Sequence, residues 1–121
     1  MCGFLIAKDN SKHNVIKYIE QMSYRGLPEY KGYKQYEGYN LAHIALPMVD
    51  PNPDIAIQPI QKDKEPPSMF VGEIFNYKDF GDYETDAIMI HETYREEMSH
   101  EFFHNLDGFW SFITFFNKKP I

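Results

Sequence analysis

The chain opens with a short apolar run, Cys-Gly-Phe-Leu-Ile-Ala at residues 2–7, which is followed at once by the polar sequence Lys8-Asp9-Asn10-Ser11. A run of this length that ends in a polar turn predicts a buried β-strand. Asn10 or Ser11 is then expected to cap a helix. Behind them an apolar face recurs at helical spacing, formed by Val15, Ile16, Ile19 and Met22. The N-terminal sequence therefore predicts a strand followed by an amphipathic helix.

The only cysteine of the chain, Cys2, stands at the start of this predicted strand. If Met1 is removed, Cys2 carries both a thiol and a free α-amine, and such an amine can accept a thiol proton near neutral pH. N-terminal nucleophiles use their own amine as the base in this way. The alternative is that Cys2 is a small buried hydrophobic residue with no chemical role.

Composition narrows the class of protein. The 121 residues are 43% hydrophobic, enough for one packed core, and the net charge of −6 argues against generic binding to nucleic acid or to anionic membranes. A lone cysteine excludes an internal disulfide bond, and neither a membrane span nor a signal peptide is visible. We therefore expect a soluble, cytoplasmic protein. His100 and His104 are four residues apart but lack a third ligand, so no metal or cofactor is predicted.

The remaining sequence predicts a mixed succession of strands and helices. Tyrosines recur between Tyr30 and Tyr39, which favours a hairpin over a base-stacking surface because the local charge is mixed. A proline-rich irregular stretch follows, of the kind that often shapes binding sites. The other expected elements are strands at 40–46, 68–74 and 109–116, a helix capped by Thr85 and running to about Glu97, and a short helix after Ser99.

Several short sequence motifs follow one another along the chain. They are Met1-Cys2-Gly3, Tyr24-Arg25-Gly26, residues 41–50 (Leu-Ala-His-Ile-Ala-Leu-Pro-Met-Val-Asp), Gln58-Pro59, residues 71–77 (Val-Gly-Glu-Ile-Phe-Asn-Tyr), Thr85-Asp86 and residues 106–112 (Leu-Asp-Gly-Phe-Trp-Ser-Phe). Together they resemble class II glutamine amidotransferases, which are N-terminal nucleophile enzymes, and most closely the glutaminase domain of asparagine synthetase. No single motif is long, but the resemblance spans essentially the whole chain.

The resemblance implies a fold, a reaction and a site. The fold is α+β, with two antiparallel sheets packed between helix layers (αββα) as in N-terminal nucleophile hydrolases, and residues 1–121 are expected to form one domain that is shortened at the C-terminus. The reaction is attack of Cys2 on the glutamine amide, with release of ammonia to a separate partner. The resemblance implies Cys2 and Gly72 as catalytic residues. The residues that the resemblance implies for substrate binding are Leu46, Met48, Val49, Gly72, Glu73 and Asp86.

Two departures from the family pattern leave the activity open. Val71 stands where the family has an oxyanion-hole Asn, and a valine side chain donates no hydrogen bond. Ala45 stands where the family has the Arg that holds the glutamine carboxylate. The protein is then a glutaminase in which Asn40, Asn76 or Arg25 replaces the lost groups, or a degraded pseudoenzyme that binds a ligand or partner. A third reading is an amidohydrolase for an amide with no α-carboxylate. Exposed sheet edges are expected to be covered by a homodimer or a partner.

Overall fold

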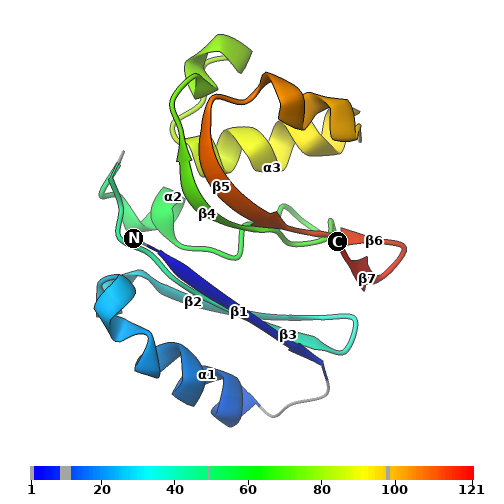
Figure 1. Cartoon of the computed structure of the whole chain (residues 1–121). Helices are drawn as coiled ribbons and strands as arrows, with labels where there is room; N and C mark the ends of the chain where they lie inside the picture. Colours follow the sequence, from blue (N-terminus) through cyan, green and yellow to red (C-terminus); the bar gives the residue numbers. More distant parts are fainter. Residues whose placement is uncertain (1, 9–11, 49, 98) are drawn as a thin grey trace.

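The computed structural model describes residues 2–8, 12–48, 50–97 and 99–121. Its elements form four layers (Figure 1): a helix, a three-stranded sheet, a two-stranded sheet and a second helix. Every strand pair in these sheets is antiparallel. The structure is therefore α+β with antiparallel sheets, as expected. The two predicted helix caps, Asn10 and Ser11, lie outside the described residues.

The first sheet has the strand order β1 (Gly3–Lys8), β3 (Tyr39–Ile44), β2 (Lys31–Tyr36). The predicted hairpin joins β2 to β3 through Glu37 and Gly38, which both have positive φ (48° and 80°), as a two-residue turn between twisted strands requires. Helix α1 (Lys12–Gln21) covers one face of this sheet. The core between them consists of Val15 and Ile19 of the helix and of Ala42 and Ile44 of β3. Burial of this apolar face is what holds α1 in place.

Strand β3 is buried on both faces because it lies between two layers. Successive side chains of a strand point to opposite faces of the sheet. Leu41 of β3 points away from α1 and packs against Met69 and Phe115, which belong to the other half of the molecule. His43, two residues further on, bonds through Nε2 to the backbone oxygen of Phe70 at 3.0 Å. The two sheets are thus joined both by apolar packing and by a buried hydrogen bond.

The second sheet pairs β4 (Met69–Ile74) with β5 (Gly108–Ile113) and is covered by α3 (Asp86–Glu97) (Figure 1). Thr85 caps α3 as predicted, because its Oγ1 accepts the N–H of Ile88 at 3.1 Å. The core between this sheet and the helix contains buried residues of β4, α3 and the following 3₁₀ helix η4 (His100–Asn105). They are Phe70, Ile74, Ala87, Met89, Ile90 and Phe102.

The predicted closing strand over residues 109–116 is wrong in its extent. Strand β5 ends at Ile113, and Thr114 instead exchanges two backbone hydrogen bonds with Ile121. The chain reverses through Asn117 and Lys118, both at positive φ, to pair β6 (Phe115–Phe116) with β7 (Lys119–Pro120). Phe115 packs edge-on against Tyr36 and Tyr39, with ring centroids 4.9 and 5.5 Å away. The local sequence predicts one continuous apolar strand, but this tertiary contact interrupts it.

The proline-rich stretch is irregular, as expected, but it contains one helical turn, α2 (Pro53–Ala56), and an isolated bridge between Ile60 and Ser68. The other short elements are the 3₁₀ helices η1 (Ser23–Arg25), η2 (Pro28–Tyr30) and η3 (Tyr77–Phe80). Within the described part of the chain, no helix is both long enough and apolar enough to cross a bilayer.

Candidate active site

Cys2 lies just before β1, and its thiol is held by the backbone of the segment that follows β3. The N–H of Leu46 donates to the Sγ of Cys2 at 3.3 Å, and the thiol can donate in turn to the Leu46 oxygen at 3.7 Å. On the other side, Nε of Arg25 donates to the Cys2 carbonyl oxygen at 3.0 Å. The next residue, Gly3, packs closely against two side chains, because an added Cβ would lie 2.6 Å from the flexible end of Met22 and 3.2 Å from Cδ of Arg25. Cys2 is thus fixed by contacts on both sides.

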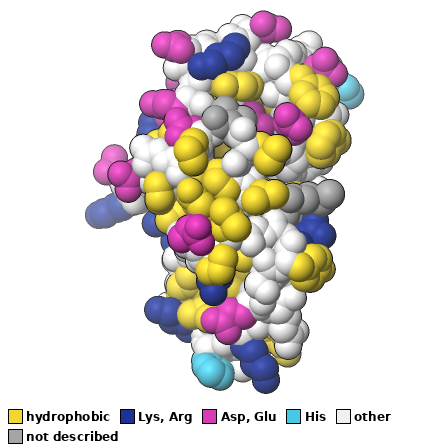
Figure 2. Space-filling view, turned by 90° about the vertical axis from the view of Figure 1, so that its left-hand side faces the viewer, with side chains coloured by type: hydrophobic (Ala, Val, Ile, Leu, Met, Phe, Trp, Pro, Cys, Tyr) yellow, Lys and Arg dark blue, Asp and Glu magenta, His cyan; other side chains and the backbone are white. Residues whose placement is uncertain are grey.

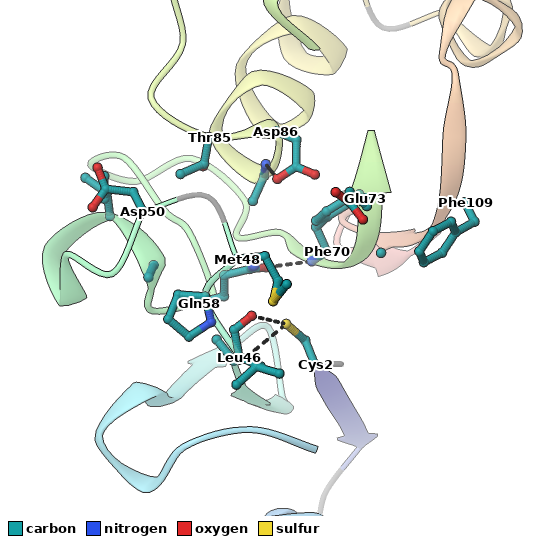
Figure 3. Close-up of a pocket in the computed structure, with 16 residues that line it drawn as sticks. Cys2, Leu46, Met48, Asp50, Gln58, Phe70, Glu73, Thr85, Asp86 and Phe109 are labelled. Atoms are coloured by element: carbon teal, nitrogen blue, oxygen red, sulfur yellow. Dashed lines mark hydrogen bonds between the residues drawn. The ribbon is translucent and has the colours of Figure 1, made fainter. Parts of the chain in front are cut away.

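The thiol faces a pocket of about 310 Å³ between the two sheets and α2 (Figure 3). The volume lies at the lower end of the range for small-molecule sites. Of the residues predicted for the site, the structure brings six to this one pocket: Cys2, Leu46, Met48, Gly72, Glu73 and Asp86. The seventh, Val49, lies outside the described residues. The rest of the wall is largely apolar, formed by Ala45, Pro47, Ile55, Ala56, Phe70, Ala87 and Phe109.

Gly72 forms part of the wall through its backbone. It has a φ of +135°, and an added Cβ would lie 2.1 Å from the carbonyl oxygen of Phe109 on the neighbouring strand. Both the dihedral angle and the close approach require glycine at this position. Val71 is not among the described residues that line the pocket. The strand therefore presents backbone rather than a side-chain donor to the cavity at this point.

Asp86 is buried at the first turn of α3, where its carboxylate accepts two backbone hydrogen bonds. Oδ2 accepts from the N–H of Ile74 at 3.0 Å and Oδ1 from the N–H of Ala87 at 2.9 Å. Burial raises the pKa of the Asp86 carboxyl, and the hydrogen bonds from the backbone oppose that shift. Glu73 adds a smaller raising effect through like-charge repulsion. The carboxyl group is thus held rigidly in the wall by β4 and by its own helix.

The ionisable groups that line the pocket carry one sign of charge. Asp50, Glu73 and Asp86 come from three different segments of the chain and surround one cavity (Figure 3). Among the described residues that line the pocket, there is no lysine or arginine. Ala45 lies in the wall at the position where the family resemblance implies an arginine. The pocket is therefore an acidic and largely apolar cavity next to a thiol, with Gln58 and Thr85 as uncharged polar side chains in its wall.

Sequence reasoning did not single out Asp50, Gln58 or Phe109 as members of the site. Gln58 is buried, and its Oε1 accepts the N–H of Phe70 at 2.6 Å, which fixes the wall strand. Asp50 and Gln58 both occur in the segments that carried the family resemblance, so a signal for them existed. Phe109 also lies in such a segment, residues 106–112, and it reaches the pocket because β5 pairs with β4 at Glu73.

The three residues expected to replace the missing groups lie elsewhere. Asn40 is buried in the first sheet, where its Oδ1 accepts hydrogen bonds from Tyr33 and Gln35. Asn76 ties together the loops beyond β4 and before β5, through Asn105 and Asp107. Arg25 contacts the backbone of Cys2, and none of the three lines the pocket as the structure describes it. They cannot supply an oxyanion donor or a carboxylate clamp from these positions.

No cluster of three or more His, Cys, Asp and Glu side chains in the described ranges is arranged to hold a metal ion. Residues 1–120 match the family described as glutamine amidotransferase domain. The chain belongs to this family. The match covers the wider family and does not single out asparagine synthetase. A comparison with curated proteins gives no match. In this glutamine amidotransferase-like protein, Cys2, Gly72 and Asp86 line one pocket.

Proposed function

We propose that the protein hydrolyses the side-chain amide of glutamine or a closely related amide, with Cys2 as an N-terminal nucleophile in an N-terminal nucleophile fold of residues 1–121. The observation that carries the proposal is the position of the Cys2 thiol. It lies at the wall of the pocket in a domain of the glutamine amidotransferase family, and the Leu46 N–H donates to it at 3.3 Å. Ammonia released in the pocket would pass to a separate acceptor, for which a protein partner is the simplest candidate.

The mechanism begins with removal of Met1, which gives Cys2 a free α-amine. The amine takes the thiol proton, and the sulfur attacks the amide carbon to form a C–S bond and an oxyanion. The proton then passes to the amide nitrogen, the C–N bond breaks and ammonia leaves. A thioester remains on Cys2, and water, deprotonated by the same amine, attacks it. The C–S bond breaks, the carboxylic acid product leaves and the thiol is restored.

Residues of the pocket can assist specific parts of this reaction. Gly72 contributes backbone rather than a side chain to the wall, so its N–H is the expected donor to the oxyanion. The Leu46 N–H stabilises negative charge on the sulfur, because a charged acceptor strengthens a hydrogen bond. Asp86 is the expected partner of the substrate ammonium, since it is an anion in the pocket wall. With Val71 next to Gly72, one side-chain donor is absent, and we expect a slow enzyme.

The test combines intact mass spectrometry with an ammonia assay. The mature protein should lack Met1. Millimolar 6-diazo-5-oxo-norleucine, offered both as the free acid and as its methyl ester, should add one reagent to Cys2, and a Cys2→Ser variant should release no ammonia above background. If Met1 is retained, or if neither form of the reagent labels Cys2 and no amide releases ammonia, the proposal is wrong.

A second candidate function is ligand or partner binding without catalysis. The observation that favours it is the lack of any side-chain hydrogen-bond donor at Val71, beside the only pocket-lining glycine that the structure describes. In that case amides would bind to wild type and to Cys2→Ser equally, with no turnover by either protein. Isothermal titration beside the ammonia assay separates the two candidates.

A further inference from the structure

The charge of the pocket is the starting point for an inference about substrate choice, which rests on the proposed function. Free glutamine carries an α-ammonium and an α-carboxylate. Asp50, Glu73 and Asp86 give the pocket several anionic groups that can attract an ammonium. The described lining offers no lysine or arginine that could attract a carboxylate. Sites that bind carboxylates ordinarily supply a guanidinium fork or another strong donor set.

Backbone donors at the start of α3 do not fill this role, because they are already engaged. The N–H of Ala87 is bound by Asp86 Oδ1 at 2.9 Å, and that of Ile88 by Thr85 Oγ1 at 3.1 Å. The N–H of Met89 donates to the Thr85 oxygen at 3.0 Å. A helix N-terminus binds an anion through free N–H groups, and here the carboxylate of Asp86 already occupies that position. A substrate carboxylate would meet no lysine or arginine among the described residues of the pocket and no free N–H among residues 87–89 of α3, and it would be close to like charges.

The rim of the pocket accommodates a substrate that continues beyond its α-carbon. Met48 and Phe109 line the pocket, yet their exposed fractions are 77% and 57%. Figure 2 shows the side of the molecule on which the N-terminus and α2 lie in Figure 1. Hydrophobic side chains gather over the middle of this face, and both acidic and basic side chains lie around them. Such a rim suits a neutral extension of the substrate better than a free carboxylate.

We propose that the pocket selects glutamine-type amides that keep a free ammonium but whose α-carboxyl is joined in an amide bond, as in the first residue of a peptide. The ammonium lies against the carboxylates of the wall, and the side-chain amide reaches Cys2. The capped carboxyl faces the rim, and the rest of the substrate runs over Met48 and Phe109. The reaction is the hydrolysis already described, in which water replaces ammonia on the side-chain carbonyl carbon.

The test uses four compounds that vary each charge separately. They are glutamine, glutamine α-N-methylamide, N-acetylglutamine and N-acetylglutamine α-N-methylamide. Ammonia release and the mass of the product are measured for each, and Cys2→Ser supplies the blank for spontaneous cyclisation. We expect kcat/KM for glutamine α-N-methylamide to exceed that for glutamine by about tenfold or more, with both acetylated compounds slower still. Ala45→Arg should reverse this preference, and Ala45→Met is the control for added bulk.

The outcomes separate this inference from the proposed function. If wild type hydrolyses free glutamine as fast as the methylamide or faster, the inference is wrong while the hydrolase function stands. If the acetylated methylamide matches the methylamide with a free ammonium, the assigned role of the pocket carboxylates is wrong. If none of the four compounds releases ammonia, both the inference and the proposed function fail.

Discussion

The Nε atom of Arg25 donates a hydrogen bond of 3.0 Å to the carbonyl oxygen of Cys2, whose thiol accepts a hydrogen bond from the N–H of Leu46 at 3.3 Å. Arg25 does not line the pocket as described, so we expect it to act through Cys2 rather than on the substrate. A residue that positions the nucleophile matters because small errors in that placement have large effects on rate.

Replacing Arg25 with Met should therefore lower kcat by about tenfold and leave KM within about twofold, because the hydrogen bond orients the nucleophile and not the ligand. Arg25→Lys keeps a donor and should recover part of the loss. Steady-state kinetics on the best amide from the four-compound panel provides the measurement. An increase in KM with unchanged kcat would show instead that Arg25 shapes the binding pocket.

Val71→Asn tests whether the missing oxyanion donor limits the rate. The residue precedes Gly72 on β4 and is half-buried opposite Ser111 of β5. An amide that reaches the oxyanion should raise kcat by about tenfold or more, since one such donor is worth about 10²–10³ in comparable enzymes. Val71→Leu is the matched control and should not raise kcat. If Asn and Leu have the same effect, the oxyanion is not formed beside residue 71.

The sequence predicted most of this fold because its elements are locally consistent. Three local patterns each predicted one element. The apolar run behind Met1 predicted a strand, the helical spacing from Val15 to Met22 a helix, and Thr85 a helix cap. The structure contains all three, as β1, α1 and the start of α3. The break at Thr114 could not be predicted in this way. It depends on Phe115 packing against Tyr36 and Tyr39, which are far away in the sequence.

Some residues of the candidate site could likewise be predicted from the sequence, and others could not. Cys2, Gly72 and Asp86 could be named from short motifs, because their chemistry is tied to residue type at a fixed place in the pattern. Pairing of β4 with β5 brings Phe109 to the rim, and only the three-dimensional structure shows that Arg25 lies behind Cys2. The one-sided charge of the pocket is likewise a property of three segments that meet only in the fold.

Thr85→Ala should destabilise the protein through loss of a helix cap. The hydroxyl accepts the Ile88 N–H at 3.1 Å in a buried position, so removing it leaves that donor unpaired. We expect a decrease of about 1 kcal/mol in the free energy of unfolding, measured by urea denaturation. Thr85→Ser keeps the oxygen and should lose less than half as much. Equal losses in the two variants would assign the effect to the methyl group instead of the cap.

Acid should destabilise the fold through two buried histidines. Burial lowers the pKa of His43 and of His91 to about 4, and Arg95 contributes to the lowering at His91. The hydrogen bond to the Phe70 oxygen opposes the lowering of the His43 pKa. The charge of Glu92 opposes the lowering of the His91 pKa. The unfolded chain binds protons at these residues near pH 6.5, and the folded chain does so only near pH 4. Between these values the unfolded state holds more protons, so stability falls as the pH falls.

Each of these histidines should remove about 3 kcal/mol of stability between pH 6.5 and pH 4, by the linkage of its pKa shift to unfolding. His91→Asn keeps an acceptor for Ser68, which bonds to the ring Nδ1 at 2.5 Å, and should halve the slope of stability against pH in this window. His104→Asn, on an exposed side chain of η4, is the matched control and should follow wild type. Urea denaturation at half-unit pH intervals provides the measurement. If His91→Asn and wild type lose stability with the same slope from pH 6.5 to 4, the His91 ring is not held neutral by burial.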